Sequence, residues 1–208
     1  MSDTPTTPPD ATKAYLDKAA KIHQLYEDRA RSSDTPWYLY TDGSGQVDVP
    51  GAAAHVIYHR LNGTYSWGVS SFSSTTVERV ELQALLDGLH AISGHALADG
   101  LMQVILNGDA SRVQVVWVGD RENLIRSVLR DEQNMTLNRR RINLDLWMSL
   151  AYWEQFFEIL PVQRPRNTVP AQGVADEICG VARISLRDLI ASIAPGISAT
   201  LSPPPTCQ

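Results

Sequence analysis

The chain has little cysteine, no long apolar run and no excess of basic residues. Its two cysteines, Cys179 and Cys207, lie far apart and outside any Cys-x-x-Cys spacing, so neither a structural zinc site nor a disulfide framework is predicted. No stretch of about 18 apolar residues occurs, which argues against a membrane-spanning helix. The opening MSDTPTTPPDATK lacks the apolar core of a signal peptide. A cytoplasmic protein with no membrane partner is expected.

The charge and composition limit the function classes further. The net charge is -5 and the isoelectric point is near 5.5, so the chain has no general basic field with which to bind nucleic acid, and any such contact must be local. Hydrophobic residues make up 43% and charged residues 20% of the 208 residues, as in ordinary globular proteins. This length is sufficient for one domain with extensions.

The sequence divides into a domain with two appended ends. Residues 1–36 are predicted to form a disordered Thr/Pro-rich tail and an amphipathic helix, residues 37–194 the domain, and residues 195–208 a flexible Pro/Ser-rich tail. The helix is indicated by apolar residues at helical spacing within Ala11–Ala30, namely Tyr15, Ala19, Ile22 and Tyr26. It offers a surface for a protein partner or a second copy of the chain.

The hydrophobic pattern predicts an α/β domain with a mixed five-stranded sheet flanked by helices. An antiparallel meander should come first, because Asn62-Gly63 is a strong hairpin signal, and alternating helices and strands should then add parallel strands. The strands are expected at Trp37–Thr41, Ala52–Arg60, Thr64–Ser71, 113–118 and Phe156–Val162. The helices are expected at 78–92, 122–130, Leu144–Gln155 and Val174–Ile193.

Four carboxylates stand at positions that suggest a site. Asp42 and Asp120 each follow an apolar strand; if those strands are adjacent and parallel, the two side chains meet at the edge where α/β sheets carry their sites. Glu81 shares a helix face with Ala84, Leu85 and Leu89, and a carboxylate on an apolar face needs a cation or a hydrogen-bond network.

Each carboxylate also has an ordinary structural explanation. Asp42 in Asp-Gly-Ser-Gly is typical of a turn, and Asp120 of a helix N-cap. Glu81 could pair with Arg79 or Arg112. Asp176 is expected in the first turn of the last helix, where the helix dipole favours an acidic residue.

Five segments, in order, resemble the ribonuclease H family. The family opens with a strand ending in TDGS, as in YLYTDGSG, and its first helix carries a glutamate in a segment similar to TTVERVELQAL, which holds Glu81. A buried strand ending in aspartate is matched by VVWVGD at Asp120, and a helix with a DLW element by NLDLWMSL. An aspartate opening the last helix is matched by VADEICGVA at Asp176.

This resemblance, which spans residues 37 to about 184, implies a metal-dependent endonuclease that hydrolyses the RNA strand of RNA–DNA hybrids. It implies that four carboxylates hold two Mg²⁺ ions about 4 Å apart, with Mn²⁺ as a substitute and Asp42 as the ligand shared by both ions. These catalytic and metal-binding residues are Asp42, Glu81, Asp120 and Asp176. The implied substrate contacts are Gly43, Ser44, Gly45, Arg79, Arg139, Arg140, Arg141 and Arg166.

Three features depart from the family pattern. The loop QRPRNTVPAQG lacks the histidine that the family often carries before its last aspartate, and Arg166 is the candidate to stand in for it. Val77 and Glu78 occupy the positions of an Asn pair with which many members read RNA 2′-hydroxyls. The connection formed by residues 93–112 is longer than expected. For Arg139–Arg141, a solvated charge cluster is the alternative to a phosphate contact.

The leading hypothesis is therefore hybrid-directed endonuclease activity, with nucleic acid as the partner. A second hypothesis keeps the chemistry but directs it at structured DNA or single-stranded RNA, which the missing Asn pair favours. A third is a non-catalytic binding or scaffold module of the same fold. Retention of all four carboxylates argues against the third hypothesis, because nothing would then require like charges to be held together.

Overall fold

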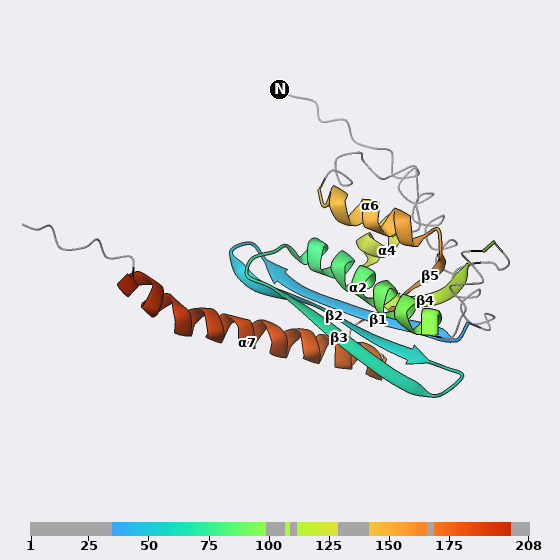
Figure 1. Ribbon diagram of the computed structural model, residues 1–208, viewed down its shortest axis with the longest axis horizontal. Helices are drawn as coiled ribbons and strands as arrows, with labels where there is room; N and C mark the ends of the chain where they lie inside the picture. Colours follow the sequence, from blue (N-terminus) through green and yellow to red (C-terminus); the bar gives the residue numbers. More distant parts are fainter. Residues whose placement is uncertain (1–34, 99–106, 109–111, 129–141, 166–168, 201–208) are drawn as a thin grey trace, which may run out of the picture.

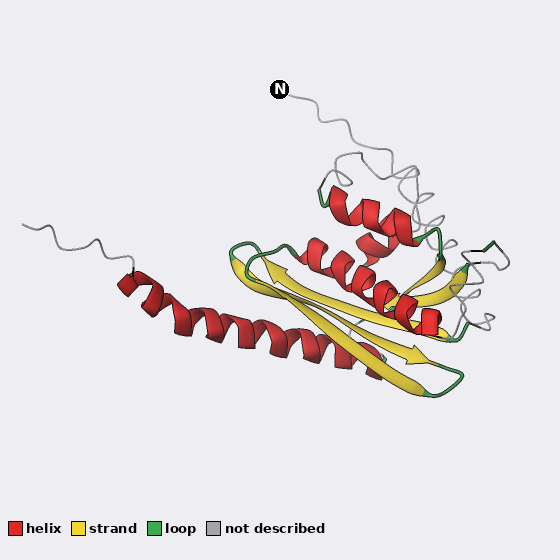
Figure 2. Cartoon of the chain, viewed as in Figure 1, coloured by secondary structure: helices red, strands yellow, loops and turns green. Residues whose placement is uncertain are grey.

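The computed structural model describes residues 35–98, 107–108, 112–128, 142–165 and 169–200, and Figure 2 shows their helices, strands and loops. The predicted N-terminal helix, Arg139–Arg141 and Arg166 lie outside the described residues. Among the described residues, no helix is long and apolar enough to span a membrane.

Five strands form one mixed sheet in the order β3-β2-β1-β4-β5, which confirms the predicted fold class. β1, β2 and β3 pair antiparallel, whereas β4 pairs parallel with β1 and β5 parallel with β4. The turn between β2 and β3 contains Gly63 at φ 67°, and the Thr64 N–H donates to Asn62 Oδ1 at 3.1 Å. The strand bounds are Trp37–Gln46, Val49–His59, Thr64–Phe72, Val113–Gly119 and Phe157–Gln163 for β1 to β5.

Helices cover both faces of this sheet (Figure 1). Successive residues of β2 point to opposite faces of the sheet. Ala53 packs with Val80 of α2 on one face, and Ala52 packs with Cys179 of α7 on the other. α4 and α6 join α2 on its face, and α7 lies on the other face and extends past the sheet. The helix bounds are Val77–Ala98, Glu122–Val128, Leu144–Trp153 and Pro170–Thr200 for α2, α4, α6 and α7.

The main core lies between α2 and the sheet. Leu39, Leu85, Leu89 and Phe157 are fully buried there, and burying each such side chain contributes about 1.5–3 kcal/mol. Trp117 is 1% exposed and donates its Nε1–H to Thr41 Oγ1 at 2.9 Å, so its one polar atom is satisfied. This packing fixes α2 over β1 and β2, and β1 carries Asp42.

The predicted turn at Asp42 is wrong. β1 runs on through Asp42 and Gly43 to Gln46, and Asp42 pairs with Ala54 of β2. The chain reverses later, at Asp48, which has φ 62°. The sequence Asp-Gly-Ser-Gly is typical of a turn, but here pairing with β2 keeps it extended and the glycines serve close packing.

The last helix begins earlier and ends later than expected. α7 starts at Pro170, a residue favoured in the first helical turn, and continues to Thr200, past the predicted end at Ile193 and into the predicted tail. Asp176 therefore lies in the second turn of α7, where the helix dipole no longer explains an acidic residue. α2 similarly extends to Ala98, which shortens the long connection predicted for residues 93–112.

We expect Gly43→Ala to destabilise the protein by about 1–3 kcal/mol, the usual range for overpacking. An added Cβ would stand 2.6 Å from the backbone N of Glu81 and 2.9 Å from the carbonyl carbon of Val80, so α2 would have to move away from β1. Gly94→Ala in the same helix is the control, because a Cβ there meets nothing within 4 Å and alanine favours helix. In urea denaturation, the midpoint should fall for Gly43→Ala and rise for Gly94→Ala. Equal changes in the two midpoints would contradict the close approach of α2 to Gly43.

Candidate metal centre

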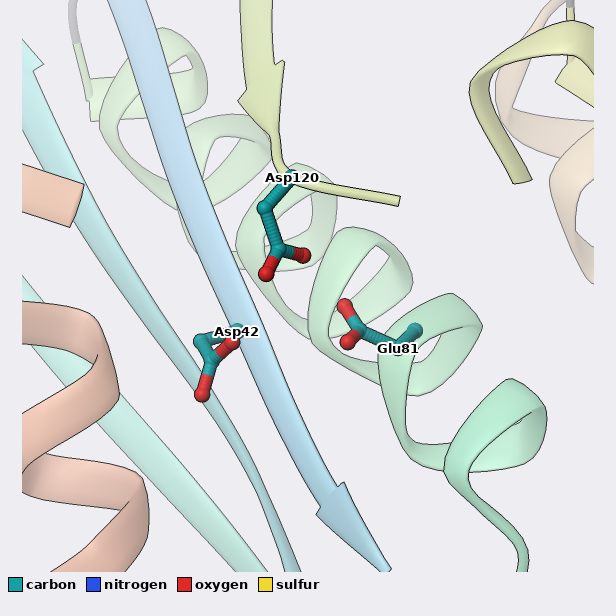
Figure 3. A group of neighbouring side chains, drawn as sticks. All are labelled: Asp42, Glu81 and Asp120. Atoms are coloured by element: carbon teal, nitrogen blue, oxygen red, sulfur yellow. The ribbon is translucent and has the colours of Figure 1, made fainter. Parts of the chain in front are cut away.

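Three of the four predicted carboxylates come together from three separate elements. Asp42, Glu81 and Asp120 each offer an oxygen, and these oxygens all lie within 4.8 Å of one another. Figure 3 shows them reaching from β1, α2 and the end of β4 toward a shared space. The structure therefore brings three of the four predicted residues together, and their role as metal ligands stays a prediction.

Asp42 and Asp120 meet because the two parallel strands end differently. The β1–β4 ladder stops at Tyr40 and Val118, after which β1 continues beside β2 alone. Asp42 lies just past this point and is 1% exposed, and Asp120 follows the last residue of β4. The gap left beside β1 is where the two carboxylates approach each other.

Glu81 reaches the cluster from the N-terminal part of α2, which packs on the sheet. Its side chain is 3% exposed, as expected for a residue on the apolar face of the helix. The backbone of α2 can come this close only because Gly43 has no side chain. Glycine at this position thus sets the distance between the carboxylates of the strand and the helix.

The cluster concentrates negative charge at a buried position. Two unit charges about 5 Å apart repel by about 3 kcal/mol at an effective dielectric constant near 20. Hard divalent cations prefer carboxylate oxygens as ligands, and a cation among the three would reverse this cost. The ligand atoms, their spacing and their burial therefore fit a metal ion.

One cation of the chain already lies beside the cluster. Arg121 Nε is 3.3 Å from Glu81 Oε1, and the Arg121 side chain is 40% exposed. The sequence suggested Arg79 or Arg112 as the partner of Glu81, and that prediction is wrong. Arg79 binds Asp145 instead, and Arg112 donates to the carbonyl oxygen of Glu154 at 3.1 Å.

Asp176, the fourth predicted carboxylate, is not within the group of three. It is half-buried on α7, the helix that also carries Cys179. Burial, followed by the negative charge of Asp42, raises the pKa of Cys179 to about 12, and Glu81 and Asp176 act in the same direction. The Cys179 thiol donates to the carbonyl oxygen of Ala52 at 3.0 Å, and it stays protonated at neutral pH.

The residues predicted to contact substrate have different surroundings. Gly43, Ser44 and Gly45 lie in β1 beside the carboxylates. Arg79 forms a bidentate pair with Asp145, at 3.0 and 2.5 Å, which raises the pKa of Arg79 and lowers that of Asp145. The pair ties α2 to α6, so the guanidinium would have to leave it to bind a phosphate.

Gln172 is a positioning residue that the sequence reasoning missed. It is 2% exposed, and its Nε2–H donates to the Thr41 carbonyl oxygen at 2.6 Å. Because this bond lies next to Asp42, it anchors the first turn of α7 beside the cluster. A glutamine four residues before Asp176 on the same helix is the only signal the sequence offered.

The chain matches a known family over the region that holds this cluster. The model of the family described as "Reverse transcriptase-like" matches residues 40–145, which include Asp42, Glu81 and Asp120. No curated protein sequence matches the chain.

Solved structures share the fold at low sequence identity. The crystal structure of LC11-RNase H1 in complex with an RNA/DNA hybrid is 16% identical, with a TM-score of 0.54, and the match covers 72% of this chain and 98% of that chain. The N-terminal RNase H domain of a Mycobacterium tuberculosis protein is 15% identical, with a TM-score of 0.52, covering 76% and 97%. A foamy viral protease-reverse transcriptase in complex with dsDNA is 15% identical, with a TM-score of 0.51, covering 73% and 96%.

We expect Mn²⁺ to raise the melting temperature of the wild type but not that of Asp42→Asn. Ligand at about a hundred times Kd stabilises a protein by about 2.7 kcal/mol, which corresponds to several degrees for a chain of this size. Asp48→Asn makes the same chemical change at an exposed turn whose φ of 62° suits asparagine, and it should respond like the wild type. Thermal shifts of equal size in all three proteins would place the metal elsewhere.

Proposed function

Because the chain belongs to the reverse transcriptase-like family, whose fold is that of RNase H, we propose that it is a metal-dependent endonuclease that hydrolyses the RNA strand of RNA–DNA hybrids. The observation that carries this proposal is the buried group of Asp42, Glu81 and Asp120, whose oxygens lie within 4.8 Å of one another. A binding module has no need to keep such a repulsive arrangement.

The roles of the residues follow from where they lie. Asp42, Glu81 and Asp120 would hold the divalent ions, with Asp176 proposed as a further ligand from α7. Bound there, the ions supply an activated water and stabilise charge on the leaving oxygen. Gly43 keeps α2 close enough for Glu81 to reach the site, and Gln172 keeps the start of α7 in place.

Nucleic acid as the proposed partner is supported by the similar structures. LC11-RNase H1 holds an RNA/DNA hybrid and the foamy viral protein holds dsDNA. In this chain, the space beside Gly43 and Gly45 is filled by Val80 and Glu81 of α2 and by Thr75 and Thr76, so the substrate contact predicted for these glycines stays a prediction. Arg139–Arg141 are retained as a proposed phosphate contact, and Mg²⁺ as the proposed ion.

A second substrate class is favoured by one feature of α2. Val77 and Glu78 stand at the start of the helix, where an Asn pair would read 2′-hydroxyls, and Glu78 is exposed. A negative charge there weakens contact with the RNA backbone. Structured DNA or single-stranded RNA is therefore the alternative substrate, cleaved by the same chemistry.

We expect the wild type to cut a labelled RNA–DNA hybrid in Mg²⁺ or Mn²⁺ and to be inactive in EDTA. Duplex DNA, duplex RNA and both single strands serve as parallel substrates, resolved on denaturing gels. Asp42→Asn should lower the rate by at least about a hundredfold, because it removes a charged metal ligand, and Asp48→Asn should retain activity.

The outcomes of this cleavage assay distinguish the proposed function from its alternatives. Cutting of another substrate, dependent on metal and on Asp42, supports the nuclease and replaces the hybrid as its substrate. Intact substrates in every lane, from a protein whose melting temperature still responds to Mn²⁺, would refute the nuclease proposal.

A further inference from the structure

A groove between α2, α4 and α6 lies next to the carboxylates. Polar side chains line part of it, namely Glu78, Asn123, Ser127 and Asn143, and Arg121 supplies the one positive charge among its described lining residues. Arg121 also contacts Glu81. Arg121 therefore lies between the groove and the carboxylate cluster, and its guanidinium can contact either a ligand in the groove or Glu81.

The backbone of Arg121 is fixed while its side chain is held weakly. Its carbonyl oxygen accepts the N–H groups of Leu124 and Ile125 at 3.1 and 3.0 Å, which locks the residue to the start of α4. By contrast, its Nε lies 3.3 Å from Glu81 Oε1, longer than the usual 2.7–2.9 Å of a charge-assisted hydrogen bond. Only the Arg121 side of this pair is exposed, because Glu81 is buried. Exchange therefore costs little only when another cation takes the place of the guanidinium at Glu81.

We propose that Arg121 exchanges partners when metal binds: it neutralises Glu81 in the metal-free protein and moves to a backbone phosphate of the nucleic acid once a divalent cation occupies the carboxylates. The phosphate half of this inference rests on the proposed function. Arg121 is a positioning and substrate-binding residue, because neither contact places it on the reacting atoms.

Electrostatics supports the exchange in both directions. A cation that binds Glu81 competes with the guanidinium and repels it, so the two positive groups oppose each other at one carboxylate. The freed guanidinium has five donors in a planar fork that suits a phosphate. Arg79 is already paired with Asp145, so Arg121 is the candidate for this contact among the described residues that line the groove.

The first test measures metal binding without nucleic acid. Isothermal titration of Mn²⁺ into Arg121→Gln should give an affinity about three- to tenfold tighter than the wild type, since an opposing charge is removed. Arg121→Lys keeps the charge and should stay near the wild-type affinity. Arg112→Gln makes the same change at the opposite end of β4 and should have no effect. Unchanged or weaker Mn²⁺ binding by Arg121→Gln overturns the exchange.

The second test measures binding of a labelled RNA–DNA hybrid by fluorescence anisotropy, in EDTA and in Ca²⁺, with gels to confirm that the hybrid stays intact. In EDTA, Arg121→Gln should bind like the wild type, because Arg121 is occupied by Glu81. In Ca²⁺ it should bind about five- to tenfold more weakly, as expected for the loss of one phosphate contact. A merely structural role predicts the same loss in both conditions, and that result overturns the proposal.

The two tests fail separately. If the wild type neither binds nor cuts the hybrid, the proposed function fails and the phosphate contact fails with it. The Mn²⁺ titration still decides whether Arg121 opposes metal at Glu81. If the hybrid is cut normally but Arg121→Gln shows neither effect, the exchange is wrong and the nuclease stands.

Discussion

Three carboxylates share one space in this protein, and the packing of the elements that carry them brings them there. Asp42 and Glu81 are almost fully buried, and two ionised carboxylates about 5 Å apart repel by about 3 kcal/mol at an effective dielectric constant near 20. The opposing force is the core between α2 and the sheet, in which each buried leucine contributes about 1.5–3 kcal/mol. Gly43 lets the backbone of α2 pack directly against β1 beside Asp42, and this contact sets the position of Glu81. The hydrophobic core therefore helps to keep the site assembled before any metal ion binds, together with the contact between Arg121 and Glu81.

The second condition for the site is an interruption in the sheet. β1 is longer than its parallel partner β4, so the ladder between them ends at Tyr40 and the strand continues with one neighbour only. Asp120, which follows β4, and the first turn of α7 lie beside this part of β1. Gln172 of α7 donates a hydrogen bond to the carbonyl oxygen of Thr41 there. A sheet with strands of equal length would have filled the same space with backbone. The mismatch in strand length is thus what makes room for ligands at this point.

Most of the fold and the three clustered carboxylates could be predicted from the sequence, because they depend on local patterns. The Asn62-Gly63 hairpin, the apolar run of β4 and the apolar face of α2 each indicate their structure directly. The misplaced turn at Asp42 and the late start predicted for α7 have a common cause: both were decided by contacts distant in sequence, with β2 in one case and with Thr41 in the other. The contact between Glu81 and Arg121 was not predicted for the same reason, because nothing in the sequence of α2 indicates that Arg121 will lie beside Glu81.

The acidic net charge of the chain says little about nucleic-acid binding once the site is considered locally. Without metal, the cluster and Glu78 present a negative surface to a phosphate backbone, and Arg121 is partly neutralised by Glu81. Divalent ions would be the largest local charges in the site and would reverse its sign. A dedicated binding module would carry its own fixed cations, whereas here the described surface near the carboxylates depends on ions that have to be bound first. Dependence of substrate affinity on the ion is therefore the property that separates an enzyme with this site from a scaffold with the same fold.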